Sequence, residues 1–298
     1  MSARDVIDFW PVAYETILQF WRLVDMPIEA VAAQRGVPLE LYSYVELGLE
    51  DMSIAHVQKR DPYSNPQNFL PVFTALAAEG WIEPVGGQLY HVTEQARSAV
   101  RELVRTGDEA LGQLGVFSTS EAERLIALLK RIVAANASAP EPPEKWATVR
   151  RFRVADDTSP LLGQVREYLL DLFAYRDDAH LSAWREYSIS GPAWNAFTLL
   201  WRGEADSPTQ IAEQAAFRGY SASEYVTAIG ELIRRGWVET AQTPGTYRVT
   251  EEGQALREGV ERQTDEYFYA PWSCLNEEEI VELRGLLGRL LERLHALP

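Results

Sequence analysis

Cysteine, basic residues and long hydrophobic runs are all scarce in this sequence of 298 residues. The single cysteine, Cys274, excludes an internal disulfide and fits a reducing cytoplasm. No apolar run approaches the roughly 20 residues that a membrane-spanning helix needs. The opening segment, MSARDVIDFW, carries acidic residues where a signal peptide is basic and then apolar. We therefore expect a cytoplasmic protein with no membrane partner.

The shortage of basic charge bears directly on function. The net charge is −16, and it is evenly divided: residues 1–149 hold 12 basic and 20 acidic residues, and residues 150–298 hold 16 and 24. Proteins that bind nucleic acid usually carry a basic surface, so DNA binding here requires local clustering of arginines. The common nucleotide-binding and hydrolase motifs are also missing. We expect no enzyme activity, no cofactor and no metal.

What is present is a clear pattern in residues 207–252. Apolar residues at helical spacing predict a short helix over 209–217 and a second helix beginning near Ser223, with Gly236 as its left-handed end. Two alternating segments, 237–239 and 247–249, then predict a β-hairpin. Helix, turn, helix and hairpin in this order are typical of a winged helix-turn-helix, which places its second helix in the DNA major groove.

The same pattern occurs a second time, in residues 53–95. Gly-Trp-Ile-Glu at 80–83 matches Gly-Trp-Val-Glu at 236–239, and Tyr-His-Val-Thr-Glu at 90–94 matches Tyr-Arg-Val-Thr-Glu at 247–251. The spacing between the copies stays near 157 residues, with slips of one residue. Such spacing predicts an internal duplication in which both halves share one fold. At this length the chain fits two domains.

We expect one unit over residues 1–135, a linker over 136–160 and a second unit over 161–298. Within the first unit, residues 5–25 and 27–35 are predicted as two helices that separate at Pro27. The linker contains a small basic cluster, Arg150, Arg151 and Arg153. Two interpretations of the cluster stay open, namely loose ion pairs in a solvated linker or a contact with a phosphate backbone.

The layout resembles a MarR-type regulator. The helix-turn-helix is followed by a wing that ends in V-T-E-x-G, a long helix, and a leucine-rich terminal helix that N-E-E-E opens. Thr250–Gly253 matches the T-E-x-G junction, and residues 93–96 match it except for Ala96. The second half is also similar to a group of actinobacterial MarR-like proteins of unassigned function, which share the Y-R-x-D-A-H of 175–180 and the T-D and P-W of 264–272.

The resemblance implies a mainly α fold with small β-wings (α+β). It implies two tandem winged helix-turn-helix domains whose long helices form an intramolecular pseudo-dimer. Because the terminal helices, which dimerise in that family, would meet within one chain, we expect a monomer with internal pseudo-two-fold symmetry.

In that family the second helix and the wing of each unit contact duplex DNA. The corresponding polar and basic residues are Lys59, Arg60, Ser64, Asn65, Gln67, Asn68, Arg218, Ser221, Ser223 and Arg248. Asparagine and glutamine can pair with adenine, and lysine and arginine with guanine or phosphate. Both wings depart from the family because they lack its acidic–arginine tip, and Glu224 would repel phosphate. The first unit is therefore the better candidate reader.

Aromatic residues gather in the second unit, where the family places a ligand pocket. The expected ligand-binding residues are His180, Trp184, Tyr187, Trp194 and Trp201. Such residues either form an aromatic wall around a small apolar ligand or pack as a core between helices. His180 also shares a helical face with Asp177, which permits proton transfer or an interhelical hydrogen bond.

Three hypotheses follow. The leading one is a MarR-like transcriptional regulator that binds duplex DNA under the control of a small apolar ligand. The alternative is a degenerate winged-helix protein that does not bind DNA and instead binds a small molecule or a protein partner. An enzyme that uses His180 and Asp177 is the third. Arginines clustered beside Asn65 and Asn68 would favour DNA, and an acidic surface there would reject it.

Overall fold

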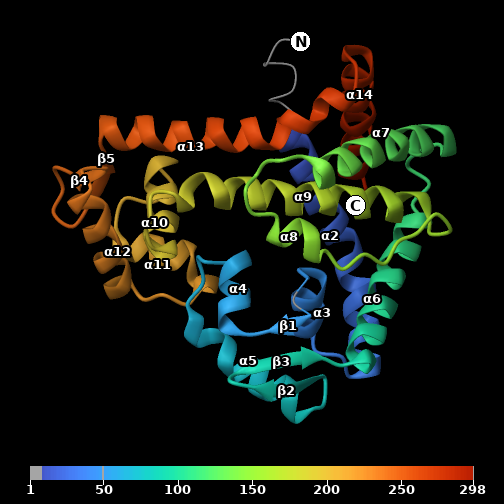
Figure 1. The fold of residues 1–298 in the computed structure, drawn as a ribbon, viewed down its shortest axis with the longest axis horizontal. Helices are drawn as coiled ribbons and strands as arrows, with labels where there is room; N and C mark the ends of the chain where they lie inside the picture. The colour runs from blue at the N-terminus through green and yellow to red at the C-terminus, as the bar shows by residue number, and fades with distance from the viewer. Residues whose placement is uncertain (1–8, 49, 298) are drawn as a thin grey trace.

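The computed structural model describes residues 9–48 and 50–297, and it is mostly helical with two small antiparallel sheets (Figure 1). Residues 1–8, which include the start of the helix predicted over 5–25, lie outside the described part. The elements of the N-terminal half are α2 (Phe9–Arg35), α3 (Leu39–Glu46), β1 (Asp51–Met52), α4 (Ile54–Arg60), η1 (Pro66–Asn68), α5 (Phe69–Ala78), β2 (Ile82–Gly86), β3 (Leu89–Val92), α6 (Glu94–Gly112) and α7 (Thr119–Ser138).

A short helix, α8 (Trp146–Arg150), connects the halves. The elements of the C-terminal half are α9 (Leu161–Arg185), α10 (Gly191–Trp201), α11 (Pro208–Gln214), η2 (Ala216–Arg218), α12 (Ala222–Arg234), β4 (Val238–Thr240), β5 (Tyr247–Val249), α13 (Glu251–Tyr269), η3 (Ala270–Cys274) and α14 (Glu277–His295).

The predicted order of helix, turn, helix and hairpin is present in both halves. In the C-terminal half, Ser221 and Glu224 form a capping box that starts α12, and Gly236 ends it with a φ of 77° in the left-handed region. The hairpin pairs Val238 with Val249. In the N-terminal half the sheet order is β1-β3-β2, so the hairpin gains a short third strand that the sequence pattern did not indicate.

The long helices of the two halves pack against one another. Helix α2 packs on α6 of its own half and on α14 of the other, while α9 packs on α13 of its own half and on α7 of the other. Figure 1 shows α9 and α13 side by side, with one compact unit at their end and the other below them. We call α3–α5 with β1–β3 the N-terminal lobe and α10–α12 with β4–β5 the C-terminal lobe.

Hydrophobic burial divides into two clusters. The larger one joins the long helices to the N-terminal lobe, and the predicted leucine stripe of α14, from Leu283 to Leu294, lies in it. The smaller one belongs to the C-terminal lobe and centres on Trp194, Phe197 and Tyr225. The C-terminal lobe therefore shares a second core with the adjoining ends of α9 and α13.

Two expectations about helix ends were wrong. Helix α2 continues through Pro27, where we expected a break, and its apolar residues on both sides of Pro27 are buried. The segment predicted as a linker begins with the last turn of α7 and contains α8, whose first backbone N–H groups, at Ala147 and Thr148, donate to Asp178 at 2.9 and 2.8 Å. This carboxylate stabilises the helix start, so a short helix forms where sequence periodicity alone did not indicate one.

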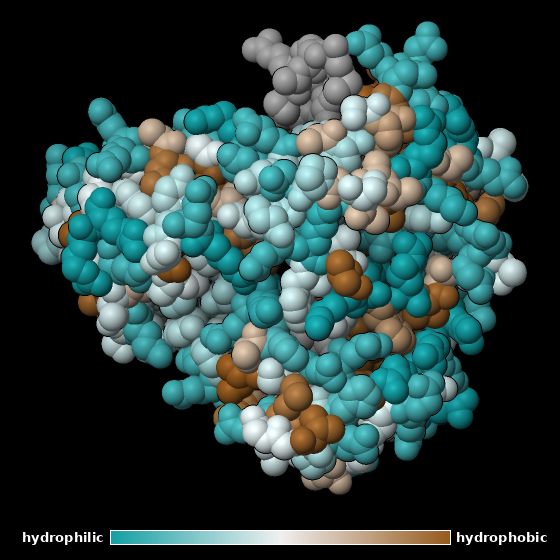
Figure 2. Space-filling view, viewed as in Figure 1, coloured by the Kyte–Doolittle hydropathy of each residue, from teal (hydrophilic) through white to brown (hydrophobic). Residues whose placement is uncertain are grey.

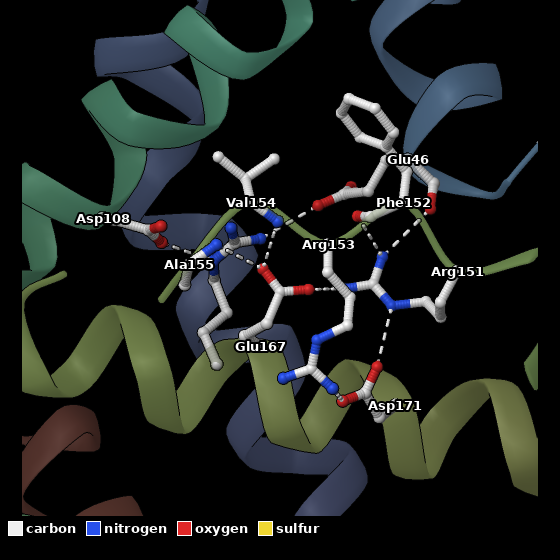
Figure 3. Close-up of polar contacts among 10 residues, drawn as sticks. Glu46, Asp108, Arg151, Phe152, Arg153, Val154, Ala155, Glu167 and Asp171 are labelled. Atoms are coloured by element: carbon white, nitrogen blue, oxygen red, sulfur yellow. Dashed lines mark hydrogen bonds and ion pairs between the residues drawn. The ribbon is translucent and has the colours of Figure 1, made fainter. Parts of the chain in front are cut away.

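The basic cluster that follows α8 is bonded to the body of the protein (Figure 3). Arg151 pairs with Glu167 and Arg153 pairs with Asp171, and both carboxylates are buried on α9. The backbone N–H of Val154 donates to Glu167 at 3.1 Å. The expectation of loose, solvated ion pairs is therefore corrected to an anchored segment.

The surface is mainly hydrophilic on the face that Figure 2 shows, where hydrophobic residues form small separate islands. Among residues 9–48 and 50–297, no helix combines the length and the hydropathy that crossing a membrane requires.

Candidate functional site

The two lobes meet near the turn between α4 and α5 and the turn between α11 and α12, and we call this contact the seam (residues 58–68 against residues 184–191 and 216–220). The backbone N–H of Asn65 donates to the carbonyl oxygen of Arg218 at 2.8 Å. The Asn65 side chain donates to the carbonyl oxygen of Gly219 at 3.1 Å. Arg218 reaches back across the seam to Asp61 at 2.6 Å and to the Ser64 hydroxyl at 3.2 Å.

The close approach of the lobes depends on two glycines. A Cβ atom on Gly219, whose φ is +73°, would lie 1.8 Å from the Asn68 amide nitrogen. A Cβ atom on Gly191 would lie 1.8 Å from the carbonyl oxygen of Pro62. A larger residue at position 191 would push the lobes apart because it meets backbone atoms, whereas at position 219 it would strain the left-handed backbone and displace the Asn68 side chain.

The seam removes several predicted DNA-contacting residues from the surface. Ser64 and Asn65 are only 6% and 9% exposed. Arg60 is buried and forms an ion pair with Asp177 at 2.9 Å. Ser64 and Asn65 make hydrogen bonds within the chain and Arg60 is held by Asp177, so these three residues are not available to read DNA in this conformation. Lys59, Gln67 and Asn68 remain exposed.

The other predicted contacts are only partly available. Ser221 is occupied as the cap of α12, and Arg248 forms an ion pair with Glu239 on the paired strand at 2.7 Å. Ser223 is exposed beside Glu224. Helix α5 contains no lysine or arginine, and the only basic residue within α12 is Arg234, at its end. The clustering of arginine that DNA binding requires is absent from both of these helices.

A cavity of about 440 Å³ lies beside the seam. Its walls come from α2, the turn after α4, α9, α10, η2 and α13. The lining residues are Trp10, Tyr14, Tyr63, Phe173, Arg176, Asp177, His180, Trp194, Asn195, Thr198, Arg202, Arg218, Arg257, Glu261 and Thr264.

Four arginines line this cavity against two acidic residues. Arg257 lies over the rings of Trp194 and Trp201, at 5.0 and 4.7 Å, and pairs with Glu261. Its buried Nε has no hydrogen-bond partner among the described residues. Burial raises the pKa of Glu261, but the charge and the hydrogen bond of Arg257 outweigh that effect and keep it below the ordinary value. The cavity thus combines aromatic walls with four arginines, each of which also pairs with a carboxylate: Asp265, Glu204, Asp61 and Glu261.

His180 is neutral in this environment, because burial, helped by Arg257, lowers its pKa to about 3. Its Nδ1 lies 3.3 Å from the Thr264 hydroxyl, and its Nε2 accepts from the indole N–H of Trp194 at 3.4 Å. Asp177 lines the same cavity but pairs with Arg60. The two residues that the sequence paired therefore share a cavity while bonding to different partners.

Of the five predicted ligand-binding residues, His180 and Trp194 line the cavity. Trp184 is buried behind Trp194, at 5.3 Å between ring centroids, and Tyr187 packs against Trp237 at 5.9 Å. The remaining residue, Trp201, is outside the lining and packs on Arg257.

Most of the lining could not be found from sequence. Arg176 had a signal, since it adjoins Asp177 in the Y-R-x-D-A-H segment. Trp10 and Tyr63 belong to the N-terminal half, and nothing local indicates that they face α9 and α13. The lining is more charged than the small apolar ligand expected from the sequence would require.

Comparison with known proteins agrees with part of this description. Residues 172–297 match the model of a helix-turn-helix family, which covers most of α9 and the C-terminal lobe with α13 and α14. No curated protein and no solved structure matches the chain. The C-terminal part of the chain is thus similar to helix-turn-helix proteins.

Proposed function

We propose that this protein binds a small aromatic anion in the cavity beside the seam. The observation that carries the proposal is the lining itself, in which four arginines and five aromatic residues surround one space in a chain of net charge −16. Aromatic walls favour a planar ligand. Guanidinium groups favour a carboxylate or a similar anion.

The geometry favours binding over catalysis. Both nitrogens of His180 are engaged, and its low pKa makes it a weak base that is not in the imidazolium form at neutral pH. Asp177 is held by Arg60. We therefore assign no catalytic step to the cavity.

We further propose that the chain is a MarR-like pseudo-dimer of two winged helix-turn-helix units that arose by duplication. The support is the repeated order of elements and the reciprocal packing of α14 on α2 and of α7 on α9. Since these terminal helices are already paired within the chain, sedimentation should give a monomer. A concentration-dependent dimer that uses α7 or α14 would contradict this proposal.

Regulation of transcription through duplex DNA is the second candidate. The match of residues 172–297 to a helix-turn-helix family favours it. The buried turns and the absence of basic residues from α5 disfavour it for the conformation described here.

Isothermal titration calorimetry with benzoate and with benzamide tests the proposed ligand class. The two probes share a ring and differ in charge, so we expect heat of binding from benzoate alone. Arg202→Gln changes an exposed arginine of the lining and should weaken benzoate binding. Arg248→Gln, on the distant hairpin, is the matched control and should bind as the wild type does. Equal binding of both probes, or no effect of Arg202→Gln, would contradict an anion site.

A further inference from the structure

The seam covers residues that the helix-turn-helix pattern predicts to read DNA. Ser64 and Asn65 precede α5, and Arg218 precedes α12. Each makes its hydrogen bonds across the seam or beside it. We infer that the seam is an autoinhibitory latch, and that separation of the lobes exposes a surface able to bind duplex DNA.

The seam is held mainly by hydrogen bonds, together with the packing of Tyr63 on Trp184 at 5.8 Å between ring centroids. Besides the bonds of Asn65 and Arg218, it includes Trp184 donating to the Tyr63 hydroxyl at 3.0 Å and Arg185 donating to the carbonyl oxygen of Lys59 at 2.7 Å. Tyr220 donates to the carbonyl oxygen of Ser64 at 3.4 Å. Such bonds exchange readily for bonds to water, so breaking them costs much less than exposing an apolar interface of equal size.

The C-terminal lobe, moving together with the adjoining ends of α9 and α13, can separate from the N-terminal lobe without exposing its core. Within the described chain, Tyr63 is the only N-terminal-lobe residue among the hydrophobic side chains that pack against the C-terminal core. The lobe continues into the body through α9 and α13, which enter and leave it. Packing at the seam is also incomplete, since the cavity borders it and the buried Nε of Arg218 and Nη1 of Arg60 lack hydrogen-bond partners among the described residues.

Opening the seam would complete a surface that can contact the bases and phosphates of duplex DNA. Lys59, Gln67 and Asn68 are already exposed beside it. Separation adds the side chains of Asn65, whose amide can pair with adenine, and Arg218, whose guanidinium can contact a phosphate. This inference concerns duplex DNA and does not rest on the proposed ligand. Hydrogen exchange and DNA binding test the latch, and the benzoate titration tests the anion site, so each proposal can fail without the other.

Gly191→Ala tests the latch without changing charge. The new Cβ would meet the carbonyl oxygen of Pro62, so the lobes must separate. Gly259→Ala is the matched control, because its Cβ would meet nothing closer than an arginine nitrogen at 3.7 Å. Circular dichroism establishes that each variant is folded. Hydrogen exchange of residues 61–68 and 216–221, and fluorescence anisotropy with a mixed-sequence duplex at two salt concentrations, are then compared.

We expect Gly191→Ala to exchange faster in both turns and to bind the duplex at least about tenfold more tightly than Gly259→Ala, with binding that weakens as salt rises. Faster exchange without any gain in DNA binding would overturn the inference. So would wild-type protein that binds the duplex as tightly as Gly191→Ala does.

Asp61→Asn provides a second opening of the seam in case Gly191→Ala does not fold or does not loosen the turns. It removes the charge that holds Arg218. Asp51→Asn, an exposed acidic residue of the same lobe, matches its change in net charge. Asp61→Asn should bind DNA more tightly than Asp51→Asn. Protection of both turns at the wild-type level in Gly191→Ala and Asp61→Asn alike would show that the latch does not open.

Discussion

Arg166 is the buried charge on which we expect the junction of the two halves to depend. It projects from α9, is 1% exposed, and donates to Asp108 on α6 and to Glu46 at the end of α3, both at 2.9 Å. Asp108 and Glu46, both labelled in Figure 3, come from the N-terminal half. A Cβ on Gly163 would lie 2.7 Å from Asp108, so α6 and α9 are in close contact here.

Arg166→Met keeps most of the side-chain volume and removes the charge. Asp108 then loses its partner at Oδ1, while its buried Oδ2 already has no hydrogen-bond partner among the described residues. Leaving one buried charge uncompensated typically costs about 3–5 kcal/mol. That is a large part of the roughly 5–15 kcal/mol by which a folded protein is stable. Urea unfolding followed by circular dichroism measures the loss.

The pH dependence separates this cause from a simple packing defect. Burial raises the pKa of Asp108, and Arg166 opposes that rise in the wild type. Without Arg166 the folded-state pKa rises further above the unfolded value, so the folded state takes up a proton more readily and gains stability as pH falls. The destabilisation by Arg166→Met should therefore be smaller at about pH 5 than at about pH 8.

Two further variants decide the interpretation. Arg166→Met combined with Asp108→Asn should be more stable than Arg166→Met alone at the higher pH, because no carboxylate remains at position 108. Arg124→Met, which breaks an exposed ion pair with Glu282, should change stability little. An Arg166→Met protein within about 1 kcal/mol of the wild type at the higher pH would refute the reasoning, given the magnitude expected for an unpaired buried charge.

Three other predictions concern stability. Burial raises the pKa of Asp171 to about 6, although Arg151 and Arg153 oppose the rise. Its contribution to stability is therefore present at low pH and is lost as pH rises through about 6. In Asp171→Asn the urea midpoint should change less with pH over that range than it does in the wild type. Leu283→Ala, at a fully buried position, should lower the free energy of unfolding in urea by about 2–5 kcal/mol. Val281→Ala, at an exposed position, should change it by no more than about 0.5 kcal/mol. Ser118→Ala removes the capping box of α7 and should cost about 1 kcal/mol in the same assay, whereas an unchanged midpoint would show that the cap is unimportant.

Local patterns predicted the elements well because their causes are local. The start of a helix near Ser223, the left-handed end at Gly236 and the alternation in 247–249 each depend on a few neighbouring residues, and all appear within a residue of where they are expected. Pro27 is the instructive failure. The missing N–H of a proline within a helix costs stability, yet burial of the apolar residues on both sides of Pro27 holds α2 together.

The candidate site was much less predictable. His180 and Trp194 were found because both lie in one aromatic-rich stretch of the C-terminal half. Trp10, Tyr63 and Arg257 could not be assigned to the cavity, because their positions depend on how α2, the turn after α4 and α13 meet. For the same reason, the polar residues around Asn65 were interpreted as a free reading surface.

By itself, the sequence determined the order of helices and hairpins, their repetition in two halves and the helical faces that are buried. These features follow from periodicity, capping and turn chemistry, which act over a few residues. Only the tertiary structure decided that the turns face each other, that Gly191 allows their contact, and that aromatic residues from both halves line one cavity. Such pairings join residues more than 100 positions apart, and they depend on the packing of whole helices, which no local pattern encodes.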